Sequence, residues 1–438
     1  MLFHATYSAV FVLAMCLWAP AQSIQAQAQD DSTRIAELER QIEAITRDLE
    51  SLTIGTEVVD PSEGGAFGLA PAAGKVYKIN QGVSLGGYGE VLYQTYSGVK
   101  ENGDPSGKSA QLDAYRGIIY VGYKFNDRLL FNSEIEIEHG STGLAGSASL
   151  EFAYVDYKLT DNFGLRAGLL LVPVGITNEV HEPPVWLGTT RPLTENKIIP
   201  TTWRESGIGF FGETEAFSYR AYLVNSLDGV GGGSSKAKGF SSSGLRGGRQ
   251  KGSKAVAENF SAVARVDYTG TPGLMIGGSL YTGDQGHNRK LEGREVDINT
   301  TIWEAHIKYQ ARGFDLQALT AQASVPNASD LNQLNGFTGS SSVGEKMNGW
   351  YAQLGYDLLW ATATEQQLLP YFRYESVNTQ VEVPTGYSSS GSKDFNVTAI
   401  GMAYKPIGNT VLKMDYQLHS NAASSGINQF NVALGWLF

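Results

Sequence analysis

The segment from Pro173 to Glu205 carries many charged side chains of both signs between two extended stretches of chain. It is too long to be a simple connector, so we expect it to have a role of its own. Charges of both signs held close together favour electrostatic selection of small ions, most strongly where low-dielectric walls focus the field. The residues concerned are Glu179, His181, Glu182, Arg191, Glu195, Lys197 and Arg204.

Covalent catalysis and metal chemistry find little support in the sequence. The histidines after the N-terminal segment are His139, His181, His287, His306 and His419, and none stands beside a recognisable Ser or Asp constellation. No Cys or His cluster has metal-ligand spacing, and no glycine-rich phosphate loop follows a strand. We therefore expect neither an enzyme nor a bound cofactor. The net charge of −11 also argues against nucleic acid as a partner.

The elements that must position the charged segment alternate in polarity along the chain. Between residues 129 and 139, Phe131, Ile135 and Ile137 share one face and Glu134, Glu136 and Glu138 share the other. A soluble sandwich would not point three successive carboxylates at an apolar core, whereas a water-filled interior accepts them. Similar alternation recurs around residues 303–309 and 412–418, as in strands with one lipid face and one water face.

Strands with a lipid face must close into a ring, because every backbone group in hydrocarbon has to be paired. Tight turns at 126–127, 161–162, 270–273 and 405–409 alternate with longer polar loops. The sequence therefore predicts an all-β fold over residues 82–438, a transmembrane antiparallel barrel of about 16 strands. The last strand carries an apolar stripe ending in a terminal aromatic residue, which is typical of the signal read by the assembly machinery of outer-membrane barrels. This stripe is Phe430, Val432, Leu434, Trp436 and Phe438.

Residues 1–28 have the order of a secretory signal peptide, with an apolar run and small residues before the expected cleavage site. The run is too short to span a bilayer as a helix, which needs about 20 residues. Cys16, the single cysteine, lies within this segment, so we expect the mature chain to have none. Export to the bacterial outer membrane is the predicted location, with the N-terminal segment in the periplasm.

Residues 29–54 are predicted to form a short periplasmic coiled coil, and residues 55–81 a linker rich in Gly, Ala and Pro. Isoleucine at both core positions favours trimers or tetramers over dimers. The alternative is a single amphipathic helix that packs on the barrel. The apolar positions follow one another at spacings of three and four: Ile35, Leu38, Ile42, Ile45, Leu49 and Leu52.

Strand parity gives the residues that can face the lumen, and they are of mixed sign. We expect the segment from Pro173 to Glu205 to fold inward as a constriction; the alternative is an ordinary surface loop. The predicted constriction residues are Glu179, Arg191, Lys197, Arg204 and Arg166. The predicted pore-lining residues are Arg116, Glu134, Glu136, Glu138, Arg220, Arg265, Lys308 and Arg373, and parity also admits Glu90, Asp156, Lys158, Asp267, Glu304 and Lys413.

The next polar loop, from Gly229 to Ala257, is basic and contains no Asp or Glu in its charged part. It is predicted to draw anions toward the mouth, to bind anionic lipopolysaccharide, or simply to be a solvated loop. Its charged residues are Lys236, Lys238, Arg246, Arg249, Lys251 and Lys254.

Three groups of residues resemble the phosphate-selective porin O and P family. They are Arg166-Ala-Gly168 with Pro173-Val-Gly175, Trp203-Arg204-Glu205-Ser206-Gly207, and Lys413-Met-Asp415-Tyr416. The resemblance spans residues 82–438 and implies a trimeric, 16-stranded channel for small anionic solutes. The stalk resembles the N-terminal coiled coil of some trimeric porins, which implies a homotrimer held by barrel walls and coiled coil. The alternative is a structural protein that tethers the envelope through its coiled coil.

Overall fold

The computed structural model describes residues 34–43, 59–61, 65–141, 143, 146–233 and 237–438. The chain divides into two compact units, Met1–Thr56 and Glu57–Phe438. In the first unit, residues 34–43 form a helix in which Arg40 and Glu37 pair at 3.1 Å. Ile35, Leu38 and Ile42 on this helix are 51–61% exposed. The predicted signal peptide and the heptad positions Ile45, Leu49 and Leu52 lie outside the described residues.

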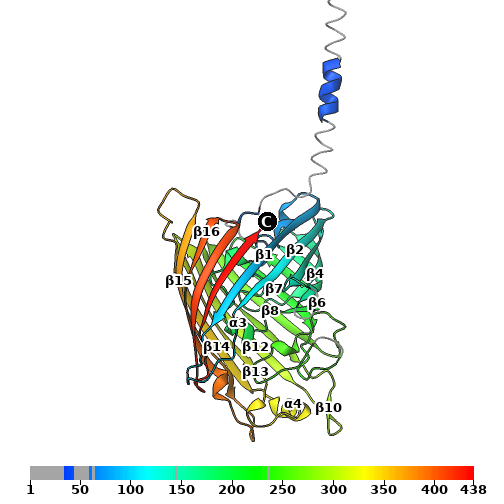
Figure 1. The fold of residues 1–438 in the computed structure, drawn as a ribbon. Coiled ribbons are helices and arrows are strands. Elements are labelled where there is room, and N and C mark those ends of the chain that lie inside the picture. The colour runs from blue at the N-terminus through cyan, green and yellow to red at the C-terminus, as the bar shows by residue number, and fades with distance from the viewer. Residues whose placement is uncertain (1–33, 44–58, 62–64, 142, 144–145, 234–236) are drawn as a thin grey trace, which may run out of the picture. The chain divides into compact units, whose positions relative to one another are not determined.

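The second unit is a closed antiparallel barrel, and its described part contains sixteen barrel strands in the order in which they occur in the chain (Figure 1). The strands are β1 (Gly82–Tyr96), β2 (Gln111–Lys124), β3 (Leu129–Glu138), β4 (Ser147–Thr160), β5 (Phe163–Leu171), β6 (Arg204–Glu213), β7 (Phe217–Asn225), β8 (Phe260–Thr271), β9 (Leu274–Asp284), β12 (Asn299–Ala311), β13 (Phe314–Ser324), β14 (Lys346–Tyr356), β15 (Gln367–Glu382), β16 (Asp394–Ile407), β17 (Thr410–Asn421) and β18 (Gln429–Leu437). The predicted fold is confirmed.

The ring closes where the last strand pairs with the first. Tyr88 of β1 lies opposite Leu437 of β18. The terminal residue completes the ladder, because Phe438 and Gly87 exchange two backbone hydrogen bonds of 2.9 Å. No strand in this described ring has an open edge, as the bilayer interior demands.

The outer surface is apolar and the inner face of each strand carries the polar residues. In β18, Phe430, Leu434 and Trp436 are exposed, whereas Asn431 is buried inside. In β3, Ile135 and Ile137 are about 40% exposed (39% and 42%), and Glu134 and Glu136 between them are almost fully buried. No helix among the described residues is long and apolar enough to traverse a bilayer.

The two ends of the barrel differ in the length of their connections. Short turns join β2 to β3, β4 to β5, β6 to β7, β8 to β9, β12 to β13 and β16 to β17, and the C-terminus lies at the same end (Figure 1). Side chains and glycines shape these turns: Asn126 accepts from the backbone N–H of Arg128 at 2.9 Å, and Gly273 and Gly313 adopt positive φ. The other end carries the long loops, with the hairpin of β10 (Lys290–Leu291) and β11 (Arg294–Glu295), helix α4 (Ala328–Leu334), and the 3-10 turns η4 (Gly339–Ser341) and η5 (Gly391–Lys393).

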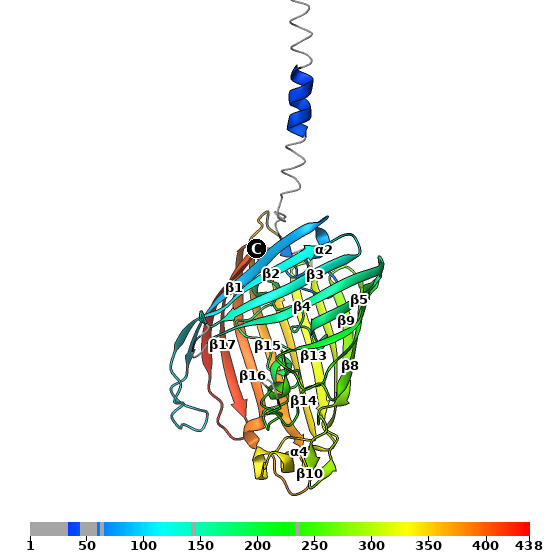
Figure 2. The same ribbon diagram turned by 90° about the vertical axis from the view of Figure 1, so that its right-hand side faces the viewer.

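Three segments outside the strands pack against the inner wall. They are residues 65–79 with helix α2 (Lys75–Lys78), residues 172–203 with η2 (Pro183–Val185) and α3 (Thr194–Lys197), and residues 226–230 and 237–251 with η3 (Arg246–Gly248). Figure 2 shows α2 at the upper end of the barrel. The described residues 65–79 are thus a packed segment rather than the flexible linker expected over 55–81. Their small Ala, Gly and Pro side chains are what allows the backbone to approach the wall closely.

Candidate pore constriction

The connection between β5 and β6 crosses the lumen and contacts walls on opposite sides of the barrel. We call residues 172–203 the constriction loop. Its helix α3 lies inside the barrel between the two ends (Figure 1). The contacts run to β3 through His181 and Glu134, to β14 through Glu195 and Tyr351, and to β17 through Thr189 and Asp415. A surface loop would reach at most the neighbouring strands, so the inward fold is what the structure contains.

Hydrogen bonds within the loop fix its base and its central turn. The Asn178 amide donates to the carbonyls of Val172 at 2.7 Å and Trp203 at 2.9 Å, and its oxygen accepts from Trp203 N at 2.7 Å. Farther along, Glu195 accepts from Thr177 N at 2.6 Å and from the Tyr351 hydroxyl at 2.6 Å. Each carboxylate or amide satisfies backbone groups that a buried loop would otherwise leave unpaired.

The far side of the loop is held by carboxylates of β15 and β17. Asp415 accepts from Thr189 N at 2.8 Å and from the Tyr371 hydroxyl at 2.7 Å. Glu375 accepts from Leu193 N and pairs with Arg373 at 2.9 Å. These acidic side chains of the inner wall thus accept hydrogen bonds from backbone N–H groups of the loop.

On β7, β8 and β12 the charges form one continuous network. Glu179 of the loop pairs with Arg220 at 3.1 Å and with Arg265 at 3.5 Å. Asp267 pairs with Arg220 at 2.9 Å and Arg265 at 2.8 Å, and His306 lies between Asp267 and Glu304. All these side chains are nearly fully buried, so the network neutralises its own charges.

On β1 to β4 the charges are arranged differently. Arg116 pairs with Glu90 at 3.2 Å and Arg204 with Glu151 at 2.6 Å. Glu151 lies within the wall because the β3–β4 register shifts between Glu134 and Ile135 and leaves it in a bulge. Arg191 of the loop lies close enough to interact electrostatically with Glu134, yet two of its guanidinium nitrogens have no hydrogen-bond partner among the described residues.

Beside its hydrogen bonds to Asp415, the loop also meets the β17–β18 wall through the Trp186 ring and Pro183. The Lys413 ammonium lies 3.8 Å from the centre of the Trp186 ring, and Lys413 is 1% exposed. This nitrogen has no hydrogen-bond partner in the described structure, so the ring is its main contact. Next to it a Cβ on residue 435 would lie 2.5 Å from Pro183, which explains the glycine there.

The five predicted constriction residues do not form one ring. Arg191 and Arg204 lie on the side of β1 to β4, and Glu179 lies in the β7–β8 network. Arg166 pairs with Asp156 at 2.9 Å and donates to the Tyr77 hydroxyl. Lys197 is half-buried at the end of α3, where its carbonyl faces Gly244.

The predicted pore-lining residues lie on the inner wall. Arg116, Glu134, Glu136, Arg220, Arg265 and Arg373 are at most 9% exposed, and Glu138 and Lys308 are half-buried. Such low exposure of charged side chains means that the inserted segments occupy much of the lumen. These charged side chains therefore contact protein atoms more than lumenal solvent.

The basic loop between β7 and β8 is not a free surface loop in its described part. Arg246 donates to the carbonyl of Thr201 at 2.6 Å, Arg249 donates to that of Thr202, and Gln250 N donates to Glu205 at 2.8 Å. Of the three alternatives for this loop, the purely solvated one does not hold for Arg246 and Arg249, because they donate to carbonyls at the end of the constriction loop. Burial lowers the pKa of Lys251 to about 8, with Arg249 and Arg204 nearby adding to the effect. Lys236 lies outside the described residues.

Trp186, Asp415, Glu375 and residues 65–79 take part in the site without having been singled out as site residues from the sequence. For Asp415 and Glu375 a signal existed, since both stand at inward positions by parity. Trp186 stood within the charged segment, but nothing in the sequence indicated its partner. Among the described residues no group of His, Cys, Asp and Glu could hold a metal ion.

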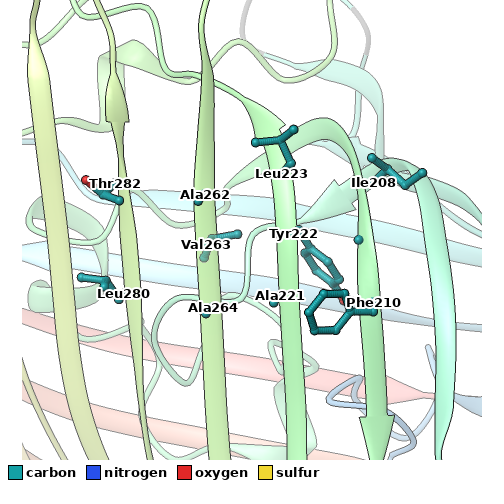
Figure 3. A pocket seen from close by; sticks show the side chains of 11 residues that line it. Ile208, Phe210, Ala221, Tyr222, Leu223, Ala262, Val263, Ala264, Leu280 and Thr282 are labelled. Atoms are coloured by element: carbon teal, nitrogen blue, oxygen red, sulfur yellow. The ribbon is translucent and has the colours of Figure 1, made fainter.

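A shallow depression of about 360 Å³ lies on the outer wall of β6 to β9 (Figure 3). Small side chains, those of Ala221, Ala262 and Ala264, line part of this depression, and the larger side chains of Phe210 and Leu280 also line it. Their side chains face outward, so the depression is separate from the lumen and apolar in character.

The fold is that of the outer-membrane porins. The chain superposes on an anion-selective porin from Comamonas acidovorans with a TM-score of 0.51, at 12% identity, over 82% of this chain and 100% of that one. It superposes on the trimer form of OmpT, an outer membrane protein of Vibrio cholerae, with a TM-score of 0.50, at 11% identity, over 82% of this chain and 100% of that one. At these identities the likeness concerns the fold alone.

The sequence comparison gives the family. The chain is 37% identical over 380 residues to an uncharacterized protein of Aquifex aeolicus (strain VF5), covering 85% of this chain and 83% of the relative. The chain therefore belongs to the same family as this Aquifex protein. No family model matches the chain.

Proposed function

We propose that this protein is an outer-membrane porin through which small hydrophilic, anionic solutes diffuse passively. The observation that carries the proposal is the constriction loop, which is anchored across the lumen of a closed barrel and leaves Arg191 without a hydrogen-bond partner among the described residues. A narrowed lumen lined by charges selects solutes by size and sign. No catalytic function is proposed.

Anion preference is supported by the basic residues that gather at one side of the constriction. Arg191 and Arg204 lie within electrostatic range of Glu134, and Arg246, from a third segment, lies within range of Glu138 and Glu151. The acidic residues Glu134, Glu136 and Glu138 oppose them, so the net preference depends on which charges face the passing solute. The resemblance to the phosphate-selective porin O and P family points the same way. The residues that we propose to face the pore are Arg116, Glu134, Glu136, Glu138, Arg220, Arg265, Lys308 and Arg373 on the inner wall.

The test is the reversal potential of the purified protein in a planar bilayer under a KCl gradient. We expect anion preference, reduced in Arg191→Ala and in Arg204→Ala. Arg128→Ala is the matched control. Arg128 is exposed in the short turn between β2 and β3, so this substitution removes the same charge outside the lumen. Cation preference in the unmodified protein would contradict the anionic assignment, and absence of any conductance would contradict the porin itself.

We further propose that the protein is a homotrimer held by barrel walls and by the helix at residues 34–43. The apolar side chains Ile35, Leu38 and Ile42 are exposed on this helix, and an exposed apolar stripe of this kind favours self-association. Changing Ile35 and Leu38 together to Asp should lower the temperature at which the trimer dissociates, with the single-channel conductance unchanged. An equal effect from Glu39→Lys, on the same helix, would contradict the role of the stripe.

The same helix supports a second candidate, a periplasmic tether to another component of the envelope. Deleting residues 29–54 separates the two functions: a porin keeps its conductance, whereas a tether loses its envelope role. The proposed location is the bacterial outer membrane, with residues 29–54 in the periplasm and residues 1–28 removed on export. Proposed partners are outer-membrane lipid and lipopolysaccharide around the wall, and the barrel-assembly machinery at Phe438.

A further inference from the structure

Residues 65–79, which we call the plug, occupy the lumen near the short-turn end of the barrel (Figure 2). Hydrogen bonds attach the plug to several strands. The Asn132 amide donates to the carbonyl of Ala73 at 2.9 Å, the Lys124 ammonium to that of Ile79 at 2.7 Å, and the Tyr77 hydroxyl to Asp156 at 2.5 Å. These contacts lie on β2, β3 and β4, so the plug covers one side of the lumen.

The plug is also packed through apolar contacts. The Phe67 ring lies 5.0 Å from that of Phe211 and 4.9 Å from that of Tyr77. Val76 sits against the wall at Gly122, where a Cβ would approach a Val76 methyl group to 2.6 Å. Ala72 and Val76 are each 1% exposed. A segment with such packing has one position in the barrel.

One side chain joins the plug to the constriction loop. Glu182, which follows His181 in the loop, accepts from Ala73 N at 2.9 Å and from Ala72 N at 3.2 Å, one bond to each carboxylate oxygen. Glu182 is fully buried. A buried carboxylate that satisfies two backbone N–H groups makes charge-assisted bonds, which are stronger than neutral ones. Its removal would leave both N–H groups buried and unpaired.

We propose that the plug is a fixed part of the channel's narrowing and that Glu182 is the positioning residue that keeps it in place. This inference rests on the proposed porin function. The constriction loop narrows the middle of the lumen and the plug narrows the end that carries the short turns. Solutes therefore meet two restrictions that share one hydrogen-bonded link.

A removable cross-link tests this arrangement. A Cβ on residue 86 would lie 3.8 Å from Ala72 Cβ, which matches the usual Cβ separation of a disulfide. Gly86 does not have positive φ, so its backbone conformation admits cysteine, although the carbonyls of Phe438 and Ala72, at 3.1 and 3.3 Å from the added Cβ, must move slightly. Cys16, the only cysteine of the sequence, lies in the predicted signal peptide. The pair Ala72→Cys and Gly86→Cys thus locks the plug to β1 until a reductant is added.

The informative protein combines this pair with Glu182→Ala. Oxidised, it should conduct like the unmodified protein; reduced, its conductance should rise about twofold, because the loosened plug leaves part of the lumen. In the pair alone, with Glu182 present, oxidised and reduced proteins should conduct equally. An increase on reduction in the pair alone overturns the fixed plug. Equal conductance of oxidised and reduced protein in the Glu182→Ala background overturns the role of Glu182.

Thiol labelling gives a readout that needs no conduction. In outer-membrane preparations a membrane-impermeant maleimide should label Ala73→Cys at least about tenfold more slowly than Asn80→Cys, because Ala73 is 3% exposed and Asn80 is exposed. Glu182→Ala should remove most of this difference. Equal labelling of the two cysteines with Glu182 present overturns the plug, and unheated gel migration of the barrel shows that each variant is folded.

The two proposals fail in different ways. If the unmodified protein conducts, and neither the disulfide nor Glu182→Ala changes its conductance, the proposal for the plug is overturned. The proposed porin function then remains. No current from any variant, together with slow labelling of Ala73→Cys, overturns the porin and with it the plug's part in conduction, while the packed plug itself stands.

Discussion

Two sectors of the inner wall use the same residue types in opposite ways. In the paired sector, on β7, β8 and β12, every guanidinium meets a carboxylate. In the open sector, on β1 to β4 and the facing part of the constriction loop, Arg191 has guanidinium nitrogens without a hydrogen-bond partner among the described residues. The paired sector contains Arg220, Arg265, Asp267, Glu304 and His306, and the open sector contains Glu90, Arg116, Glu134, Glu136 and Arg191.

The difference separates charges that hold the constriction loop in place from charges that, on the proposed function, act on a solute. A charge whose field is cancelled by a neighbour 3 Å away has little left for a passing ion. In the paired sector the charges instead fix Glu179, and through it the constriction loop. In the open sector Arg116 is paired with Glu90, but two guanidinium nitrogens of Arg191 have no hydrogen-bond partner among the described residues. We therefore propose that selectivity depends on Arg191 and that loop placement depends on the paired sector.

The largest expected effect comes from breaking the paired sector. Asp267→Ala leaves Arg220, Arg265 and His306 without their shared carboxylate, and the loss of one partner of a buried network costs about 3 kcal/mol. Urea titration followed by tryptophan fluorescence should show the lower stability. Asp127→Ala, in an exposed turn, is the control and should have no effect. A stability equal to that of the unmodified protein would remove the structural role of this sector.

The open sector should respond in selectivity and not in stability. Arg191→Ala should lower the anion-to-cation permeability ratio about twofold, because one positive charge is lost from the focused field, with the urea midpoint unchanged. Glu138→Gln, on β3 in the same sector, should shift the ratio in the opposite direction. If both changes move the ratio in the same direction, charge is not what the sector contributes.

The dependence on pH gives a smaller and graded effect. Lys251 has a pKa lowered to about 8 by burial, so it is charged below pH 8 and loses its charge as the pH rises through 8. Anion preference should therefore decline between pH 7 and pH 9, and Lys251→Met should abolish this decline. The reversal potential measured at a series of pH values is the readout. If anion preference still declines with pH in Lys251→Met, another titratable group causes the decline.

The smallest expected change is at Trp186. Replacing Trp186 by Ala exposes the Lys413 ammonium and removes a cation–π contact worth about 1 kcal/mol. Conductance should rise slightly and anion preference should increase, both by less than the change that Arg191→Ala produces. A fall in anion preference would mean that the Lys413 charge does not face the solute.

The sequence predicted the barrel well because its signals are local. Alternation around Glu134 and Glu136, the polar turn at Asn126 and the terminal stripe ending in Phe438 each arise from a lipid face and a water face on one strand. These patterns need no knowledge of distant residues. The strand order and the inward position of most wall charges followed from them.

The site was less predictable because it depends on pairs that are far apart in the sequence. Strand parity places Arg220 and Asp267 on the same face of the sheet. It does not predict that these two side chains form an ion pair, or that Glu179 also pairs with Arg220. Residues 65–79 are rich in Ala and Gly, and such a composition suits a flexible linker as well as a closely packed segment. For the same reason, the basic loop gave no sign that Arg246 and Arg249 would meet carbonyls of the constriction loop.

The seam between β1 and β18 brings the two ends of the folded unit to one place. A Cβ on Gly86 would meet the carbonyl of the last residue, Phe438, at 3.1 Å and that of Ala72 at 3.3 Å. The barrel wall thus becomes complete only when the final residues of the chain are added. The plug therefore lies against the wall at the place where β18 closes the ring onto β1. A chain shortened by its last residue would lose the two backbone hydrogen bonds between Phe438 and Gly87, next to the place where the plug packs on β1.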